Sequence, residues 1–137
     1  MSTTASIQTP ERAGTTIKVP IAATTKILQG TILARNAAGY AVPGTDVASI
    51  VVLGIALEEV DNTAGAAGDL SVNVARARAF LLKNDGTNPV TVASIGTAGA
   101  AVIKDNETVC VAAGATNDIP VGKPIEIAAD GVWVEIF

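Results

Sequence analysis

Hydrophobic residues recur at every second position over short stretches of this chain, and turn-forming residues separate the stretches. Ile17, Val19 and Ile21 form one such set, which has the period of a half-buried β-strand. The pattern predicts roughly eight to ten short strands and no long helix. The stretches that predict strands are residues 17–21, 26–35, 40–42, 47–60, 70–83, 98–104, 107–112, 121–128 and 132–137. Residues 89–95 are compatible with a short helix or a short strand.

The two longest runs carry most of the hydrophobic residues. Residues 47–60, "VASIVVLGIALEEV", are so uniformly apolar that they predict a strand in the core or at a contact between subunits. Residues 70–83, "LSVNVARARAFLLK", alternate and predict one long strand, although Ala, Arg and Leu also favour helices. One face of that strand is expected to carry Val72, Val74, Arg76, Arg78 and Phe80. The other face is expected to carry Asn73, Ala75, Ala77, Ala79 and Leu81.

Turn-forming residues mark the breaks between the predicted strands. Gly30 interrupts its run and indicates a bulge or a bend. Asp105-Asn106 predicts a hairpin, and Asp130-Gly131 predicts a second one, because Asp-Gly supplies the positive φ angles of a type I′ turn. In "NDGTN", Gly86 is expected to adopt the left-handed conformation.

Regular strand spacing with these turns predicts an all-β fold, a small β-barrel or β-sandwich, formed by residues 17–137 as a single domain. Residues 1–16 are rich in Thr and Ser and show no hydrophobic period, so they predict an extended N-terminal arm. Two interpretations of the arm stay open: a flexible end of no importance, or a segment that orders on a partner. The arm residues that we select as candidate contacts are Thr3, Thr4, Ile7 and Arg12.

Charge and composition exclude several classes of function. The net charge is −4 and the nine basic residues are scattered, which argues against binding nucleic acid. The chain has no histidine and one cysteine, Cys110, whose place in an apolar strand predicts a small buried residue. Most zinc sites and most nucleophile–base pairs are thereby excluded, so we expect neither an enzyme nor a cofactor.

The acidic loop over residues 58–69 also has two interpretations. Its carboxylates suggest a calcium site, but their spacing does not match a calcium loop, which favours a solvated loop. Gly65 and Gly68 suggest a phosphate-binding loop, but no Lys-Ser or Lys-Thr follows, and Asp69 would repel phosphate.

No targeting or membrane signal is expected from the sequence. The first residues lack the basic and apolar regions of a secretory signal. The longest apolar stretch, residues 47–57, is far shorter than the roughly 20 residues of a membrane helix. We therefore expect a soluble protein made in the cytoplasm, with no membrane partner.

Four residues of the predicted β domain are candidate contacts. Arg76 and Arg78 are expected on one face, either solvated and salt-bridged or in an interface, where arginine is enriched. Trp133 is expected to be a core or interface anchor. Alternation in the last segment, "DGVWVEIF", places Trp133 and Phe137 on one face and Val132, Val134 and Ile136 on the other. Both faces carry hydrophobic residues, so one is expected to line the core and the other to meet a neighbouring layer or subunit.

The order of segments resembles that of a known family of small virion proteins. The middle of the chain, "VVLGIALEEVDNTAGAAGD" followed by "LSVNVARARAFLLKND", is similar to these proteins, and the last third is more similar. The residues of the last third that match are Ile95-Gly96, Asp105, Thr108-Val109, Pro120-Val121-Gly122-Lys123 and Gly131-Val132-Trp133-Val134-Glu135-Ile136. The family is that of tailed-bacteriophage capsid cement, or decoration, proteins. The similarity covers roughly residues 26–137, and the chain departs from it at Ala79-Phe80, where the family often has glycine before the aromatic residue.

This resemblance implies a small β-barrel or β-sandwich on the outer surface of an icosahedral head. A β-tulip-like arrangement is one form that the resemblance allows. It implies that the protein binds neighbouring copies of an HK97-fold major capsid protein after the shell expands. It further implies association with itself as a homotrimer, with a dimer as the alternative, and location in the virion. A receptor- or carbohydrate-binding module of a phage fibre is the competing function, although four aromatic residues provide little for sugars to stack on.

Overall fold

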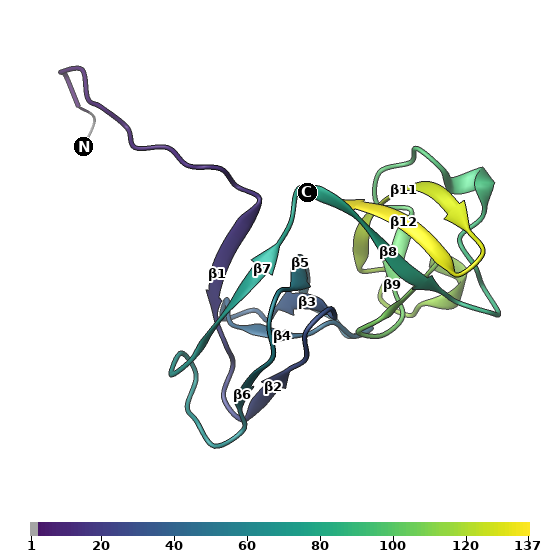
Figure 1. The fold of residues 1–137 in the computed structure, drawn as a ribbon, viewed down its shortest axis with the longest axis horizontal. Coiled ribbons are helices and arrows are strands. Elements are labelled where there is room, and N and C mark those ends of the chain that lie inside the picture. Colours follow the sequence, from purple (N-terminus) through teal and green to yellow (C-terminus); the bar gives the residue numbers. More distant parts are fainter. Residues whose placement is uncertain (1–2) are drawn as a thin grey trace.

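Two β-structures lie side by side in this protein, a five-stranded sheet and a closed barrel (Figure 1). The computed structural model describes residues 3–137, so Met1 and Ser2 of the predicted arm lie outside the described residues. Strands predominate, and the helical segments are the two short 3₁₀ turns η1 (Val92–Ser94) and η2 (Ala112–Gly114). The prediction of an all-β fold with a barrel is confirmed.

The sheet has the strand order β1-β7-β5-β3-β4, and all of its neighbouring strands are antiparallel. Its strands are β1 (Thr16–Pro20), β3 (Ile32–Arg35), β4 (Ala41–Pro43), β5 (Val51–Ala56) and β7 (Ser71–Ala75). A separate antiparallel pair is formed by β2 (Thr25–Ile27) and β6 (Val60–Asn62). Strands β1 and β4 form the two edges of the sheet, and the chain enters the sheet at β1.

The barrel has the strand order β10-β8-β12-β11-β9 and is closed. Its strands are β8 (Arg78–Asn84), β9 (Ala101–Ile103), β10 (Thr108–Cys110), β11 (Pro120–Ala128) and β12 (Gly131–Ile136). Strands β10 and β8 run parallel, and the other described pairs are antiparallel. The two predicted hairpins, β9–β10 and β11–β12, are both present.

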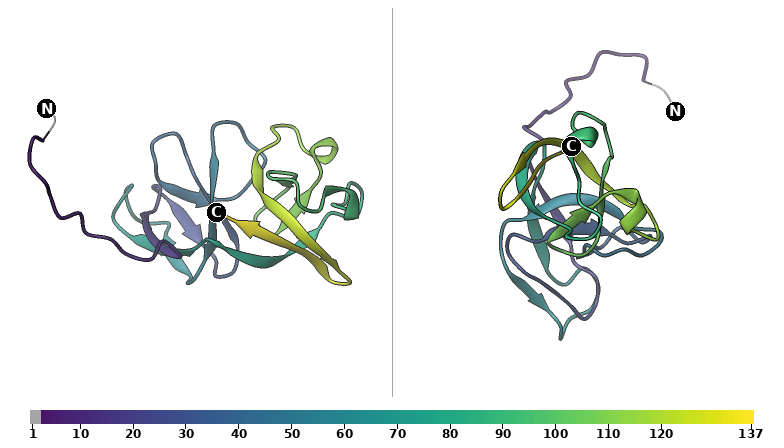
Figure 2. Two further views of the ribbon diagram at one scale, coloured as in Figure 1. Left: turned by 90° about the horizontal axis from the view of Figure 1, so that it is seen from above. Right: turned by 90° about the vertical axis from the view of Figure 1, so that its right-hand side faces the viewer.

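One hydrophobic cluster joins the sheet to the barrel. It combines Ile32 and Ile55 of the sheet with Ile103, Val134 and the other inward residues of the barrel. A second cluster lies between the sheet and the β2–β6 pair. The views in Figure 2 show the sheet and the barrel as adjoining parts of one body, from which the N-terminal arm extends.

The predicted strand over residues 70–83 is wrong as a single strand, because it is two strands in different structures. β7 belongs to the sheet and β8 to the barrel, and the chain changes direction between them at Ala77, whose φ is +59°. Residues 26–35 likewise divide into β2 and β3, with Gly30 at a φ of +80° in the turn between them. Alternation continues across the break at Ala77, so periodicity alone does not reveal it, whereas Gly30 marks the other break in the sequence.

Residues 47–60 differ from the prediction in burial. Ile55 is buried, but Val47 and Val51 lie on the surface, and Val51 is 47% exposed. Ile50, Val52 and Ile55 contribute to the shared cluster, whereas Leu53 and Ala56 contribute to the cluster at the β2–β6 pair. The stretch is therefore only partly in the core, and a contact between subunits stays a prediction for its exposed residues.

Two glycine predictions are corrected by the backbone. In the β11–β12 hairpin, Ala128 pairs with Gly131, so the turn residues are Ala129 and Asp130, and none of these has a positive φ. Gly131 is needed for a different reason, because a Cβ there would collide with the carbonyl oxygen of Leu82 in β8. Gly86 has no positive φ either, so the left-handed conformation predicted for it is absent.

The Asp46 carboxylate connects a loop of the sheet to a loop of the barrel. Its Oδ2 accepts a hydrogen bond from the backbone N–H of Thr116 (2.7 Å), and its Oδ1 accepts one from that of Asn117 (2.9 Å). The Asn117 side-chain amide donates back to the Asp46 carbonyl oxygen (3.1 Å). These hydrogen bonds hold the pKa of Asp46 below its usual value, and the bond from Thr116 has the largest effect, followed by that from Asn117.

We expect the Asp46 contact to make stability depend on acid pH. Because the pKa is lower in the folded state, the contribution is complete above the ordinary value of 3.8 and is lost as the pH falls through the folded pKa. Asp46→Asn should lower the melting temperature at pH 7 and converge with the wild type at the acid end of a series of thermal melts. Asp130→Asn, in the exposed β11–β12 turn, is the control. A constant difference between Asp46→Asn and the wild type at every pH would contradict the prediction.

Candidate interaction surface

The N-terminal arm, residues 3–15, is extended and exposed along its whole length, as predicted (Figure 1). Its one large hydrophobic side chain, Ile7, is 72% exposed. Within residues 3–13 the hydrogen bonds are those between the Thr3 hydroxyl and the backbone of Ala5. Thr4 and Arg12 are also exposed, so the arm presents its candidate contacts to solvent.

The root of the arm is fixed to the place where the sheet passes into the barrel. The carbonyl oxygen of Thr15 accepts a hydrogen bond from the Arg76 N–H (2.9 Å), and that of Gly14 accepts one from Arg76 Nη1 (3.3 Å). The next residue, Ala77, donates its N–H to the carbonyl oxygen of Ile136 (2.6 Å). The structure therefore brings the arm, the β7–β8 crossover and the end of β12 together.

Arg76 and Arg78 lie close to this root but do not share a strand face. Ala77 separates them, and only Arg78 belongs to β8. The Arg76 side chain is half-buried against the arm, whereas Arg78 is exposed. The two ion pairs found within residues 3–137 join other residues, so the salt-bridged alternative is not observed for either arginine.

Trp133 lies on the outer face of the barrel and not in the core. Val132, Val134 and Ile136 share one face, as the alternation predicts, and the structure shows that this is the face buried inside the barrel. Trp133 is 36% exposed and pairs across the sheet with Leu81 of β8, which is 39% exposed. Phe137, directly after β12, is 70% exposed. This exposure argues against the core alternative for Trp133, and the interface alternative stays a prediction.

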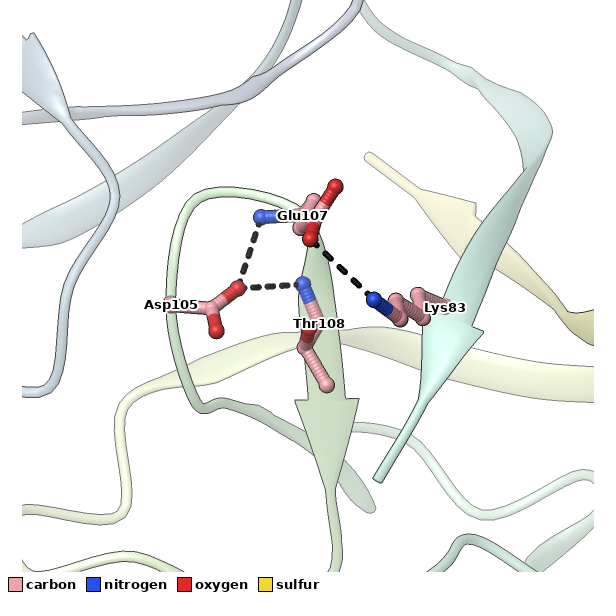
Figure 3. A network of polar contacts seen from close by, with 4 residues as sticks. All are labelled: Lys83, Asp105, Glu107 and Thr108. Carbon is pink, nitrogen blue, oxygen red and sulfur yellow. Dashed lines mark hydrogen bonds and ion pairs between the residues drawn. The ribbon is translucent and has the colours of Figure 1, made fainter. Parts of the chain in front are cut away.

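Charged residues border this outer face. Lys123 Nζ lies 3.6 Å from Glu135 Oε1 and 6.0 Å from the centre of the Phe137 ring. At the other end of the strands, Lys83 Nζ lies 3.3 Å from Glu107 Oε1 (Figure 3). The turn that carries Glu107 is held by Asp105, whose Oδ1 accepts the N–H groups of Glu107 (3.0 Å) and Thr108 (2.8 Å).

The acidic loop forms local hydrogen bonds. Asp61 Oδ1 accepts hydrogen bonds from the hydroxyl and the backbone N–H of Thr63. These two bonds lower the pKa of Asp61, and the bond from the hydroxyl has the larger effect. Asp69 Oδ2 accepts a hydrogen bond from the backbone N–H of Ala66. Within residues 3–137, no group of three or more His, Cys, Asp or Glu is placed to hold a metal ion. The same part of the chain contains no helix long and apolar enough to cross a bilayer.

Cys110 is buried, as predicted, on strand β10 of the barrel. Burial raises the pKa of its thiol, which keeps the sulfur protonated and weakly nucleophilic. The structure therefore places Cys110 in the role of a small core residue.

A groove of about 570 Å³ lies beside the edge strand β4. The residues that line it are mainly small and apolar: Asn36, Ala37, Val42, Pro43, Thr45, Val47, Ala48, Ser49 and Ile50. This lining, within the described part of the chain, offers neither a charged nor an aromatic side chain. The groove suits an apolar contact better than a sugar or an ion.

Comparison with known proteins gives no relative: no family model, no curated protein and no solved structure matches this chain. Inferences about function therefore rest on the surface described above.

Sequence reasoning did not select Leu81, Lys123 or the groove beside β4 as candidate contacts. Leu81 becomes notable only through its pairing with Trp133, which is 52 residues distant along the chain. Lys123 becomes notable through Glu135 and Phe137 in the same way. Alternation placed Leu81 on the alanine-rich face of its predicted strand, but it indicated neither that this face is exposed nor which residue lies opposite.

Proposed function

We propose that this protein is a structural virion protein that binds the outer surface of an expanded icosahedral phage head. In this proposal it binds across neighbouring copies of an HK97-fold major capsid protein and stabilises the contacts between them. The proposal includes association of copies at one site on the shell, as a trimer or a dimer. It involves no catalysis, nucleic acid, membrane or cofactor.

The observation that carries the proposal is the exposed arm attached to a rigid β body. Thirteen described residues, 3–15, extend away from the body and bury none of their side chains on it. A segment of this kind gains contact area only when it lies along another molecule, and its ordering cost is offset by Ile7 and the backbone it brings. On a shell with many equivalent sites, such modest contacts add through multivalency.

The competing function, a receptor- or carbohydrate-binding module, has less support. Sugar sites use exposed aromatic rings with polar groups around them. The groove beside β4 has no aromatic lining residue, and Trp133 stands as a single exposed ring between Leu81 of β8 and Glu126 of β11.

Removing the arm should abolish or strongly weaken attachment while leaving the body folded. Deleting residues 1–13 keeps Gly14 and Thr15, whose carbonyl oxygens hold Arg76. Burial of one isoleucine contributes about 1.5–3 kcal/mol, so we expect binding to be at least about tenfold weaker. Co-sedimentation with expanded heads, formed by the major capsid protein of the same genome, measures this.

Three comparisons make the test decisive. Ile7→Ser in the full-length chain should reproduce most of the loss, and Ala13→Ser, also in the arm, should bind like the wild type. The wild type should bind expanded heads stoichiometrically and leave unexpanded heads unbound. If it binds neither form, and heads without it resist heat equally well, the proposed function is wrong.

A further inference from the structure

Two arginines at the root of the arm carry charges that no carboxylate of the described chain neutralises. Arg76 is half-buried, Arg78 is exposed, and Ala77 alone separates them in the sequence. Their Cα atoms therefore lie at most about 7 Å apart. Within residues 3–137, no carboxylate, including that of Phe137, forms an ion pair with either arginine. In a chain with thirteen acidic and nine basic residues, these two side chains form a local positive site.

The acidic residues closest to this site in sequence and in register do not compensate it. Glu135 lies opposite Ala79 in the β8–β12 register, but its Oε1 pairs with Lys123 Nζ at 3.6 Å. Glu11 lies in the exposed arm, and neither ion pair of the described residues includes it. The positive site is thus open to a carboxylate from another molecule.

The Arg76 side chain is already held in position. Its Nη1 donates to the carbonyl oxygen of Gly14, while its backbone N–H is held by Thr15. Little conformational freedom is therefore lost when an acceptor binds. A guanidinium has more N–H donors than this single bond uses, and its planar fork matches a carboxylate in bidentate geometry.

We propose that Arg76 and Arg78 bind carboxylates of an acidic segment on the protein to which the arm attaches. The two side chains do not share a strand face, so they suit separate carboxylates of one segment. The net charge of −4 repels a polyphosphate chain, which favours a peptide over nucleic acid. The inference rests on the proposed function for one point, the location of the acidic segment on the outer surface of the shell.

Arg78→Gln should weaken attachment to expanded heads about tenfold to a hundredfold, the range for losing a hydrogen bond to a charged group. The wild type should also lose more affinity than this variant when salt is raised from about 50 mM to about 300 mM, because salt screens the ionic contact. Co-sedimentation measures both effects, and circular dichroism checks that the exposed substitution leaves the fold intact.

Arg35→Gln is the matched control. It changes the net charge equally, and Arg35 Nη1 also donates to a backbone carbonyl oxygen, that of Asn36 (3.3 Å). Arg35 lies in β3, which β7 and β5 separate from β1, so its variant should attach like the wild type. Arg76→Lys should retain more affinity than Arg76→Gln, since it keeps the charge, and equal losses would contradict a charge contact at Arg76.

A test without heads uses hexaglutamate as the probe and hexaglutamine as its control. In proton–nitrogen correlation spectra, hexaglutamate at about 1 mM or above, the range for a weak contact, should shift the Nε–Hε signals of Arg76 and Arg78. The Arg35 signal should stay in place. Equal shifts with hexathymidylate or with inorganic phosphate would show a site for any anion and would overturn the proposal.

The two experiments separate this inference from the proposed function. If the wild type binds expanded heads and both Arg76→Gln and Arg78→Gln bind equally well, the inference is wrong and the proposed function stands. If hexaglutamate shifts the two arginine signals but the wild type does not bind heads, the acidic-segment site stands and the proposed function is wrong.

Discussion

Gly54→Ala is expected to lower the free energy of unfolding by about 3 kcal/mol or more, enough to leave a domain of this size marginally folded. Gly54 lies in the centre of β5 with a φ of +156°, and a Cβ there would collide with the carbonyl oxygen of Ala75 in β7. The Val74 Cγ1 methyl would be only 3.0 Å away. Because β7 is held between β1 and β5, its backbone has no free direction in which to move.

Gly30→Ala is the control that separates the steric clash expected at Gly54 from the backbone cost of replacing any glycine that has a positive φ. Gly30 also has a positive φ, +80°, but no atom lies within 4 Å of the position of its Cβ. We expect a cost of about 1 kcal/mol there, from backbone conformation alone. Urea denaturation of both variants measures the difference, and equal costs would show that close strand packing at Gly54 is not the reason.

Ile103→Ala is expected to lower the free energy of unfolding by about 2–5 kcal/mol, the range for truncating a fully buried isoleucine. Ile103 lies in β9 with no exposed surface and belongs to the cluster that joins barrel and sheet. Its Cδ1 approaches Gly44, at the end of β4, so closely that a Cβ at Gly44 would lie 2.5 Å from it. The substitution therefore opens a cavity at the junction of the two parts.

Two optical probes measure the effect of Ile103→Ala. Trp133 fluorescence reports the barrel and far-ultraviolet circular dichroism reports all strands, and we expect their urea transitions to coincide, because the shared cluster couples the two parts. Ile125→Ala, at an exposed position of β11, is the control and should cost less than about 1 kcal/mol. Transitions that separate in the wild type would mean that sheet and barrel unfold independently.

The sequence by itself determined the local features of this protein. Alternation predicted β1, β4 and both late hairpins, and it placed Val132, Val134 and Ile136 together on one face, because side chains of a strand alternate between two faces. That this face is the one that lines the core came from the structure. The lack of any period in the first residues predicted the extended arm. Composition predicted a buried Cys110, since a cysteine between two valines in a strand lacks polar neighbours.

Only the tertiary structure decided how these strands are grouped. The alternation of residues 70–83 passes unbroken through Ala77, yet the chain leaves the sheet there and enters the barrel, because the pairing partners β1 and β12 are distant in sequence. The same long-range pairing places Leu81 beside Trp133 and Arg76 beside the arm root. Periodicity records which side a residue faces within its own strand, whereas a surface depends on which strands become neighbours, and that is set by packing of the whole chain.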